Sequence, residues 1–110
     1  MNERERRIGL NEAVYREVNE KLRTVNEAFA TITDNFEIMC ECGHSTCDDR
    51  LSIAPGAYEE LRRDPILFAI VPGHEIPDVE DVIATTEAYA VVRKHPGDPA
   101  KVAAQTDPRS

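Results

Sequence analysis

A cluster of three cysteines is the part of this sequence best suited to chemistry. Cys40, Cys42 and Cys47 are the only cysteines of the chain, and polar residues separate them. Zinc prefers thiolate and imidazole ligands, and a closed structural site takes four of them. Residues i and i+2 of an extended strand point to the same face, so Cys40 and Cys42 can reach one ion. We therefore expect a tetrahedral zinc site whose fourth ligand comes from elsewhere in the chain.

Two histidines compete for the fourth position. His74 follows Pro72 and Gly73, and this pair presents it on a tight turn. His44 lies in the short loop between two of the cysteines, where folding back onto the same ion would strain the chain. His74 is therefore the expected ligand and His44 its alternative. The predicted metal ligands are Cys40, Cys42, Cys47 and His74.

Gly43 directly follows the second cysteine. A glycine at this position lets the chain turn sharply with a positive φ. Backbone N–H groups in such a turn can donate hydrogen bonds to the thiolates. The turn therefore supports the metal hypothesis.

Other chemistry of the cysteines stays open. Three cysteines leave one unpaired in any disulfide, and a bridge between Cys40 and Cys42 would be strained. The thiols could instead be redox-active or inert and buried. An iron–sulfur cluster is less suited to three thiols, although histidine ligation of such clusters is known. The sequence does not distinguish zinc from another thiophilic metal.

A long helix is expected before the cysteines, from residue 2 to about residue 33. It contains no proline, and its apolar residues recur at heptad spacing, with Asn11 at one core position. The other core positions are Ile8, Tyr15, Val18, Leu22, Val25, Phe29 and Ile32. Such a helix is longer than the rest of the chain can cover. We expect it to bind a partner protein or a second copy, with Asn11 fixing the register; the alternative is a helix packed on its own domain.

The remaining chain predicts an α+β fold in which a small, mainly antiparallel sheet and one short helix follow the long helix and are held by zinc. Strands are expected at 36–40, 50–54, 66–71, 81–86 and 88–93, and the short helix at 56–63. The strand at 66–71 is the most apolar and should be central. The predicted organisation is a helix over 1–34, a zinc-binding module over 35–94 and a disordered tail over 95–110, which is rich in Pro, Asp, Gly and Ala.

Charge is unevenly distributed along the chain. The formal net charge is −8, of which residues 1–34 carry −1 and residues 35–110 carry −7. Nucleic-acid binding needs clustered Lys and Arg, so the acidic module disfavours it and better suits a basic or neutral protein. No apolar run is long enough to span a membrane, and no signal peptide is evident. Clustered cysteines without a secretion signal predict a reducing cytoplasm.

Residues 36–92 resemble a family of small, uncharacterised bacterial proteins that is common in actinobacteria. The residues that carry the resemblance are Cys40-Glu41-Cys42, Cys47, Tyr58-Glu59, Arg63-Asp64-Pro65, Pro72-Gly73-His74-Glu75 and Tyr89-Ala90-Val91-Val92. The resemblance implies the same metal site, with these cysteines and His74 as its ligands. It implies no activity, because none is assigned to the family.

Three functions are compatible with these features. The first is a zinc-stabilised protein-interaction module, an adaptor or regulator of a larger cytoplasmic assembly. The second is a thiol-based redox or metal sensor, since oxidation of zinc-bound thiolates releases the ion. The third, a zinc-dependent hydrolase, needs an open metal position and a carboxylate base. Glu41 or Glu75 could be that base only if His74 is not a ligand, so a non-enzymatic role is favoured.

Overall fold

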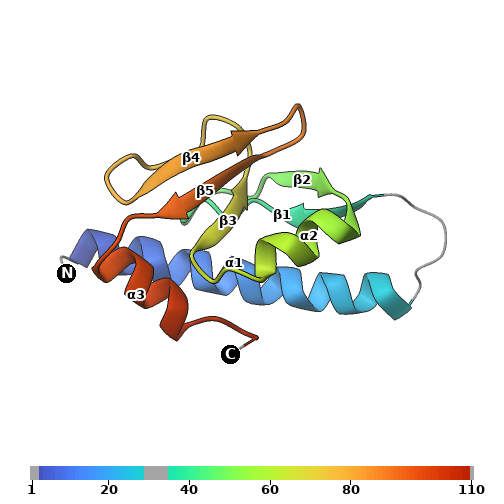
Figure 1. Ribbon diagram of the computed structural model, residues 1–110, viewed down its shortest axis with the longest axis horizontal. Helices are drawn as coiled ribbons and strands as arrows, with labels where there is room; N and C mark the ends of the chain where they lie inside the picture. The colour runs from blue at the N-terminus through green and yellow to red at the C-terminus, as the bar shows by residue number, and fades with distance from the viewer. Residues whose placement is uncertain (1–2, 29–34, 110) are drawn as a thin grey trace.

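Helix α1 (Glu3–Ala28) runs along one side of the molecule, and the strands lie above it in the view of Figure 1. The computed structural model describes residues 3–28 and 35–109. The 26 residues of α1 extend over ~39 Å, close to the longest dimension of the molecule, 44 Å. The predicted long helix is confirmed over this range. Its predicted continuation to residue 33, including Phe29 and Ile32, lies outside the described residues.

The strands form two small antiparallel sheets among the described residues, where one was predicted. Strand β1 (Phe36–Met39) pairs with β2 (Arg50–Ile53). Strands β3 (Leu67–Ile70), β4 (Glu80–Thr85) and β5 (Ala90–Lys94) form the second sheet, in the order β3-β5-β4. The α+β class is confirmed, but the prediction that the strand at 66–71 is central is wrong. Strand β3 lies at the edge of its sheet and is nevertheless apolar because the cysteine segment covers it: the Glu41 N–H donates to the carbonyl of Ala69 (2.9 Å).

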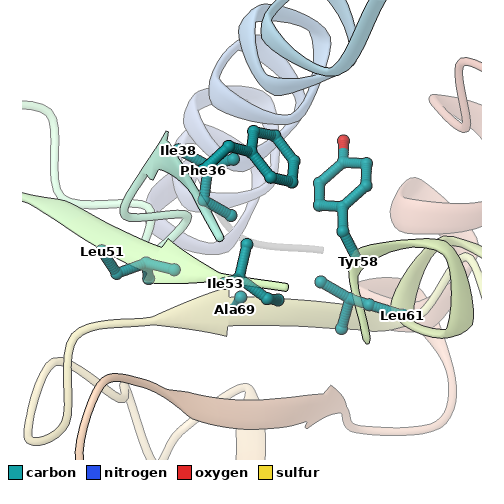
Figure 2. Packing of buried hydrophobic residues seen from close by; sticks show 7 residues of the cluster. All are labelled: Phe36, Ile38, Leu51, Ile53, Tyr58, Leu61 and Ala69. Carbon is teal, nitrogen blue, oxygen red and sulfur yellow. The ribbon is translucent and has the colours of Figure 1, made fainter. Parts of the chain in front are cut away.

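Helix α2 (Pro55–Arg62) closes the first of two main apolar clusters. Its proline occupies the first helical turn, where the missing N–H costs nothing. Figure 2 shows the aromatic rings of Phe36 and Tyr58 next to each other. Their centroids lie 5.5 Å apart and their planes are inclined at 73°, an edge-to-face arrangement. The Tyr58 hydroxyl donates to Glu20 of α1 (2.8 Å), which fastens the cluster to the long helix. The residues of the cluster are Phe36, Ile38, Leu51, Ile53, Tyr58, Leu61 and Ala69.

The prediction of a disordered tail over 95–110 is wrong, because helix α3 (Asp98–Gln105) lies there and packs beside α1 (Figure 1). Pro99 lies in its first turn, and Ala103 is buried. A Cβ on Gly9 would lie 2.9 Å from Val102 Cγ1, so the two helices approach closely. Arg16 of α1 donates to the carbonyl of Ala103 (2.8 Å). The absence of a side chain on Gly9 thus permits close packing of the two helices.

Helix α1 packs its polar face inward and leaves an apolar face exposed. Glu12, Arg16 and Asn19 are almost fully buried, at 1%, 1% and 0% exposure. We call the five exposed apolar residues the α1 apolar ridge: Leu10 (45% exposed), Val14 (60%), Val18 (39%), Leu22 (36%) and Val25 (55%). The heptad pattern predicted one continuous face, but the amphipathicity is inverted relative to that of an ordinary surface helix.

Only the later heptad positions of α1 contribute to the apolar ridge. Ile8 is buried, and Tyr15 donates a hydrogen bond to the carbonyl of Cys47 (3.0 Å). Asn11 donates to the carbonyl of Gly43 (2.9 Å). The prediction that Asn11 fixes the register of a helix pair is therefore wrong, because its side chain binds its own chain. Of the predicted heptad positions, Val18, Leu22 and Val25 belong to the apolar ridge.

A buried charged cluster joins α1 to the second sheet. Lys94 Nζ donates to Glu12 Oε1 (2.8 Å) and to Glu80 Oε1 (2.9 Å). Glu80 also accepts the backbone N–H of Ile76 (3.1 Å), whereas Glu12 Oε2 accepts no hydrogen bond from the described residues. Two carboxyl groups thus share one ammonium. Burial, reinforced by the nearby Glu80 and partly offset by Lys94, raises the pKa of Glu12 to about 8.

The raised pKa of Glu12 predicts that stability falls as pH rises from about 4.5 to about 8. In this window the folded protein holds a proton that the unfolded chain has released, and above it the difference is constant. The slope is at most ~1.4 kcal/mol per pH unit. Urea unfolding between pH 5 and 9 measures how the free energy of unfolding changes with pH. In Glu12→Gln, the decrease caused by Glu12 should be absent. Glu17→Gln, at an exposed position, is the matched control. If Glu12→Gln has the same pH dependence as the wild type, Glu12 does not cause the decrease in stability.

Candidate metal centre

The structure brings the four predicted ligand residues together. The ligand atoms of Cys40, Cys42, Cys47 and His74 all lie within 4.8 Å of one another. His74 Nδ1 lies 3.6 Å from Cys40 Sγ and 3.7 Å from Cys47 Sγ. A tetrahedral zinc ion with ordinary Zn–S and Zn–N bonds would separate such atoms by roughly 3.6 Å. The four residues therefore lie close enough to hold one metal ion.

His44, the alternative ligand, does not belong to this group. Its side chain is exposed, and its ring centroid lies 6.4 Å from that of His74. The short loop carries it to the rim of the site, as the strain argument predicted.

The end of β1 sets the direction of the first two cysteines. The Cys40 N–H donates to the carbonyl of Asp49 (2.9 Å), so the pairing of β1 with β2 continues into the cysteine segment. Cys40 and Cys42 are 1% and 0% exposed, and both pack into one cluster with apolar residues of the second sheet. These apolar residues are Phe68, Ile70, Ala90 and Val92. The prediction that both sulfurs point to one face is confirmed.

Gly43 and Gly73 form the turns that bring Cys47 and His74 to the other two cysteines. Gly43 has φ +80°, and the loop then closes with a hydrogen bond from the Cys47 N–H to the carbonyl of His44 (3.1 Å). Gly73 has φ +94°, and the His74 N–H donates to the carbonyl of Val71 (3.0 Å). Both glycines adopt a conformation that other residues rarely adopt.

Gly43→Ala is expected to lower the free energy of unfolding by about 2 kcal/mol or more. Its positive φ is strained for alanine, and the new Cβ would lie 2.8 Å from Ile8 Cγ2 and 3.2 Å from the Ile8 carbonyl oxygen. Gly73→Ala is the matched control, because it has the same backbone strain but no atom within 4 Å. Denaturant unfolding of both variants measures the difference, and equal losses would show that the contact with α1 contributes nothing.

Backbone N–H groups surround the sulfurs. The Val71 N–H donates to Cys40 Sγ (3.2 Å). The backbone N–H groups of His44 and Asp49, each two residues further along the chain, act to lower the pKa of Cys42 and Cys47. Backbone donors of this kind stabilise negative charge on sulfur and orient metal-bound thiolates. The arrangement suits thiolates better than inert buried thiols.

In the metal-free cluster, the pKa values of Cys40 and Cys42 shift in opposite directions. The Cys40 thiol donates to Cys42, which, with the His44 N–H as a further cause, lowers the pKa of Cys42 to about 5. The same hydrogen bond, and then burial, raises the pKa of Cys40. Burial also raises the pKa of Cys47. One thiolate thus forms readily in the metal-free cluster, and a cation would favour the other two.

The outer side of the site is partly open. His74 Nε2 faces a carboxylate oxygen of Asp49 at 3.6 Å, with the two side chains 29% and 57% exposed. A carboxylate on the far nitrogen of a metal-binding histidine fixes its tautomer and raises its basicity. A surface hollow is lined by His44, Thr46, Cys47, Asp48, Asp49, Gly73 and His74. Cys47 and His74 are therefore the accessible members of the group, whereas Cys40 and Cys42 are not.

Polar residues of α1 donate hydrogen bonds to the cysteine segment, a role that was not predicted for them. Asn11 and Tyr15 donate to the carbonyls of Gly43 and Cys47, as described above. Asn19 pairs with the backbone of Met39 in both directions, accepting its N–H (2.7 Å) and donating to its carbonyl (2.9 Å). The sequence feature that could have identified them is the recurrence of polar groups every four residues, at positions 11, 15 and 19, along one face of the helix.

Glu41 lies between two cysteines but points away from them. Arg62 donates to its two oxygens at 2.9 and 2.7 Å, and both side chains are essentially buried. The N–H of Ala69 (3.0 Å) and the Asn19 amide (2.7 Å) complete its hydrogen bonds. These four hydrogen bonds make Glu41 a structural anchor. The hypothesis that it serves as a catalytic base has no support in this geometry.

Comparison with protein-family models, with curated proteins and with solved structures finds no match. The resemblance to small actinobacterial proteins stays a prediction. Among the described residues, no helix has both the length and the apolar character needed to cross a membrane.

Proposed function

We propose that this chain is a zinc-stabilised protein-interaction module whose binding surface is the α1 apolar ridge. Such a module would act as an adaptor or regulator of a larger assembly. The ligand group of Cys40, Cys42, Cys47 and His74 carries the metal part of this proposal. The cysteine chemistry favours a reducing cytoplasm as the compartment.

The donor set supports zinc and a structural role. Three thiolates and one imidazole match the ligand preferences of zinc and leave no position for a substrate or catalytic water. Cys40 and Cys42 are buried beneath the site, which suits a closed centre better than a reactive one. Glu41, one of two carboxylates considered as a base, is fully engaged with Arg62. A hydrolase is accordingly the least favoured of the three functions.

The inverted packing of α1 supports the interaction role. A helix stabilised only by its own domain would bury its apolar residues and expose its charges. This helix buries Glu12, Arg16 and Asn19 and exposes five apolar side chains instead. Contiguous exposed apolar surface on a small protein commonly marks a binding site.

A redox or metal sensor is the second candidate, favoured by the exposure of Cys47 at the surface hollow. An oxidant could reach this thiolate first, and its oxidation would release the metal. Mild peroxide should then eject zinc at concentrations that leave a fully buried zinc site intact. Retention of zinc under these conditions would exclude the sensor.

Native mass spectrometry with metal analysis tests the zinc centre. The wild-type chain is expected to hold one zinc ion, which His74→Ala loses or binds at least ~100-fold more weakly. His44→Ala, a histidine substitution at the rim of the same site, is the matched control and should keep the ion. Equal retention by His74→Ala would refute the four-ligand site, and a folded chain that binds no metal would refute the zinc centre itself.

A further inference from the structure

The α1 apolar ridge lacks a partner within the described residues, and its composition indicates what would cover it. We propose that it binds a second copy of this chain, with the two α1 helices packed antiparallel about a two-fold axis near Val18. This inference rests on the proposed interaction function and names its partner. Symmetric dimers with one self-complementary patch are the commonest oligomers of soluble proteins.

The spacing of the apolar ridge is close to symmetric about its centre. Leucines and valines recur at intervals of four, four, four and three residues, from Leu10 to Val25. An antiparallel two-fold axis at Val18 places Val14 opposite Leu22 of the partner subunit and Leu10 near the partner's Val25. Packing of four-residue ridges against three-residue ridges gives a crossing angle of about 20°, which keeps such pairs in contact along the two helices. The exposed valines and leucines thus meet like residues in the second copy.

The charge distribution favours a second copy over a basic partner. Residues 35–110 carry −7 of the net charge of −8, whereas residues 1–34 carry only −1. Two copies would repel each other through their acidic modules, so α1 is the surface on which they can approach. A basic partner would instead be attracted to the acidic module. An apolar, nearly neutral surface on an acidic protein therefore suits self-association.

Two charged residues beside the apolar ridge are complementary in the antiparallel arrangement. Glu17 and Lys21 are both exposed, and their spacing places them on the same flank of the helix. Antiparallel packing brings the same flanks of two helices together. Glu17 of one copy then faces the partner's Lys21, and the reciprocal pair forms across the axis. A parallel arrangement would not bring this flank against its own copy.

Sedimentation velocity of the metal-loaded chain over a concentration series tests the dimer. The wild type is expected to reach twice the monomer mass, and Val18→Asp to raise the dimer dissociation constant at least ~100-fold. Val82→Asp on β4 is the matched control, because Val82 is 40% exposed where Val18 is 39% exposed. Metal content and far-ultraviolet circular dichroism must match those of the wild type in both variants. If Val18→Asp does not fold, Leu22→Asp replaces it as the test variant.

Charge reversal tests the orientation. Glu17→Lys makes both flanking charges positive, and Lys21→Glu makes both negative, so each variant alone should dimerise more weakly than the wild type. A mixture of the two should form the mixed dimer in preference to either homodimer. If mixing gives no preference, the antiparallel pairing is wrong.

The outcomes separate this inference from the proposed function. A wild-type chain that stays monomeric at the highest concentration overturns the dimer. So does a dimer whose dissociation constant is unchanged in both Val18→Asp and Leu22→Asp, whatever Val82→Asp does. In either case the zinc centre is judged independently, by metal analysis of His74→Ala.

Discussion

Glu41→Ala is expected to lower the free energy of unfolding by about 3–5 kcal/mol, the cost of breaking a buried ion pair. Arg62 is 1% exposed and donates to both carboxylate oxygens, so its guanidinium would be left buried without its counter-ion. The substitution also removes the acceptor of the Ala69 N–H, which holds β3 beside the cysteine segment. Since Glu41 lies between Cys40 and Cys42, metal affinity should fall together with stability.

Chemical denaturation of the metal-loaded protein measures this loss. Glu60→Ala is the matched control: Glu60 pairs with Arg63, but both side chains are about 70% exposed, and such pairs contribute less than ~1 kcal/mol. Replacing Glu41 and Arg62 together with methionine should cost less than Glu41→Ala, because no unpaired charge remains buried. A loss in Glu41→Ala no greater than that in Glu60→Ala would show that the buried pair does not stabilise the fold.

Removing the metal is expected to lower the melting temperature by about 15 °C or more. At a metal concentration 1,000 times the dissociation constant, binding contributes about 4 kcal/mol of stability, and each kcal/mol corresponds to several degrees for a domain of this size. The effect should extend to α1, because Asn11 and Tyr15 bind carbonyls within the cysteine loop. Amide exchange in the middle of α1 should therefore increase when the metal is removed.

Thermal unfolding and hydrogen exchange with and without a strong chelator measure these two effects. Cys42→Ser should reproduce the metal-free behaviour without a chelator. Ser45→Ala, in the same loop, is the control and should retain the response to metal. A melting temperature unchanged by chelation, in a chain shown to have bound metal, would contradict a structural role for the ion.

The metal cluster could be predicted because its chemistry is local. Cys40 and Cys42 share a strand face by the geometry of any extended chain, and Gly43 and Gly73 mark the turns that bring Cys47 and His74 to them. The short strands, α2 and the hairpin of β4 and β5 were recognisable for the same reason. Each depends on alternation, a proline or a turn within a few residues.

The role of α1 could not be predicted, because it depends on partners far away in the sequence. Glu12 binds Lys94, 82 residues later. Arg16 binds the carbonyl of Ala103 across 87 residues. Helix α3 was missed because its segment is rich in Pro, Asp, Gly and Ala, whereas its packing depends on the close approach of Val102 to Gly9, 93 residues earlier. A single sequence shows hydrophobic periodicity but not which buried polar group will find a distant acceptor.

The long-range bonds of α1 have a consequence for how the chain folds. Arg109 binds Glu20 and Glu59, so the last part of the described chain completes contacts of the first helix. Contacts between residues so far apart raise the contact order, which slows folding. During synthesis, Glu12 lacks its donor until Lys94 has been made, and Arg16 lacks one of its acceptors until Ala103 has been made. Newly made α1 therefore exposes both its unpaired polar face and its apolar ridge, and this period is when the chain is most prone to aggregate.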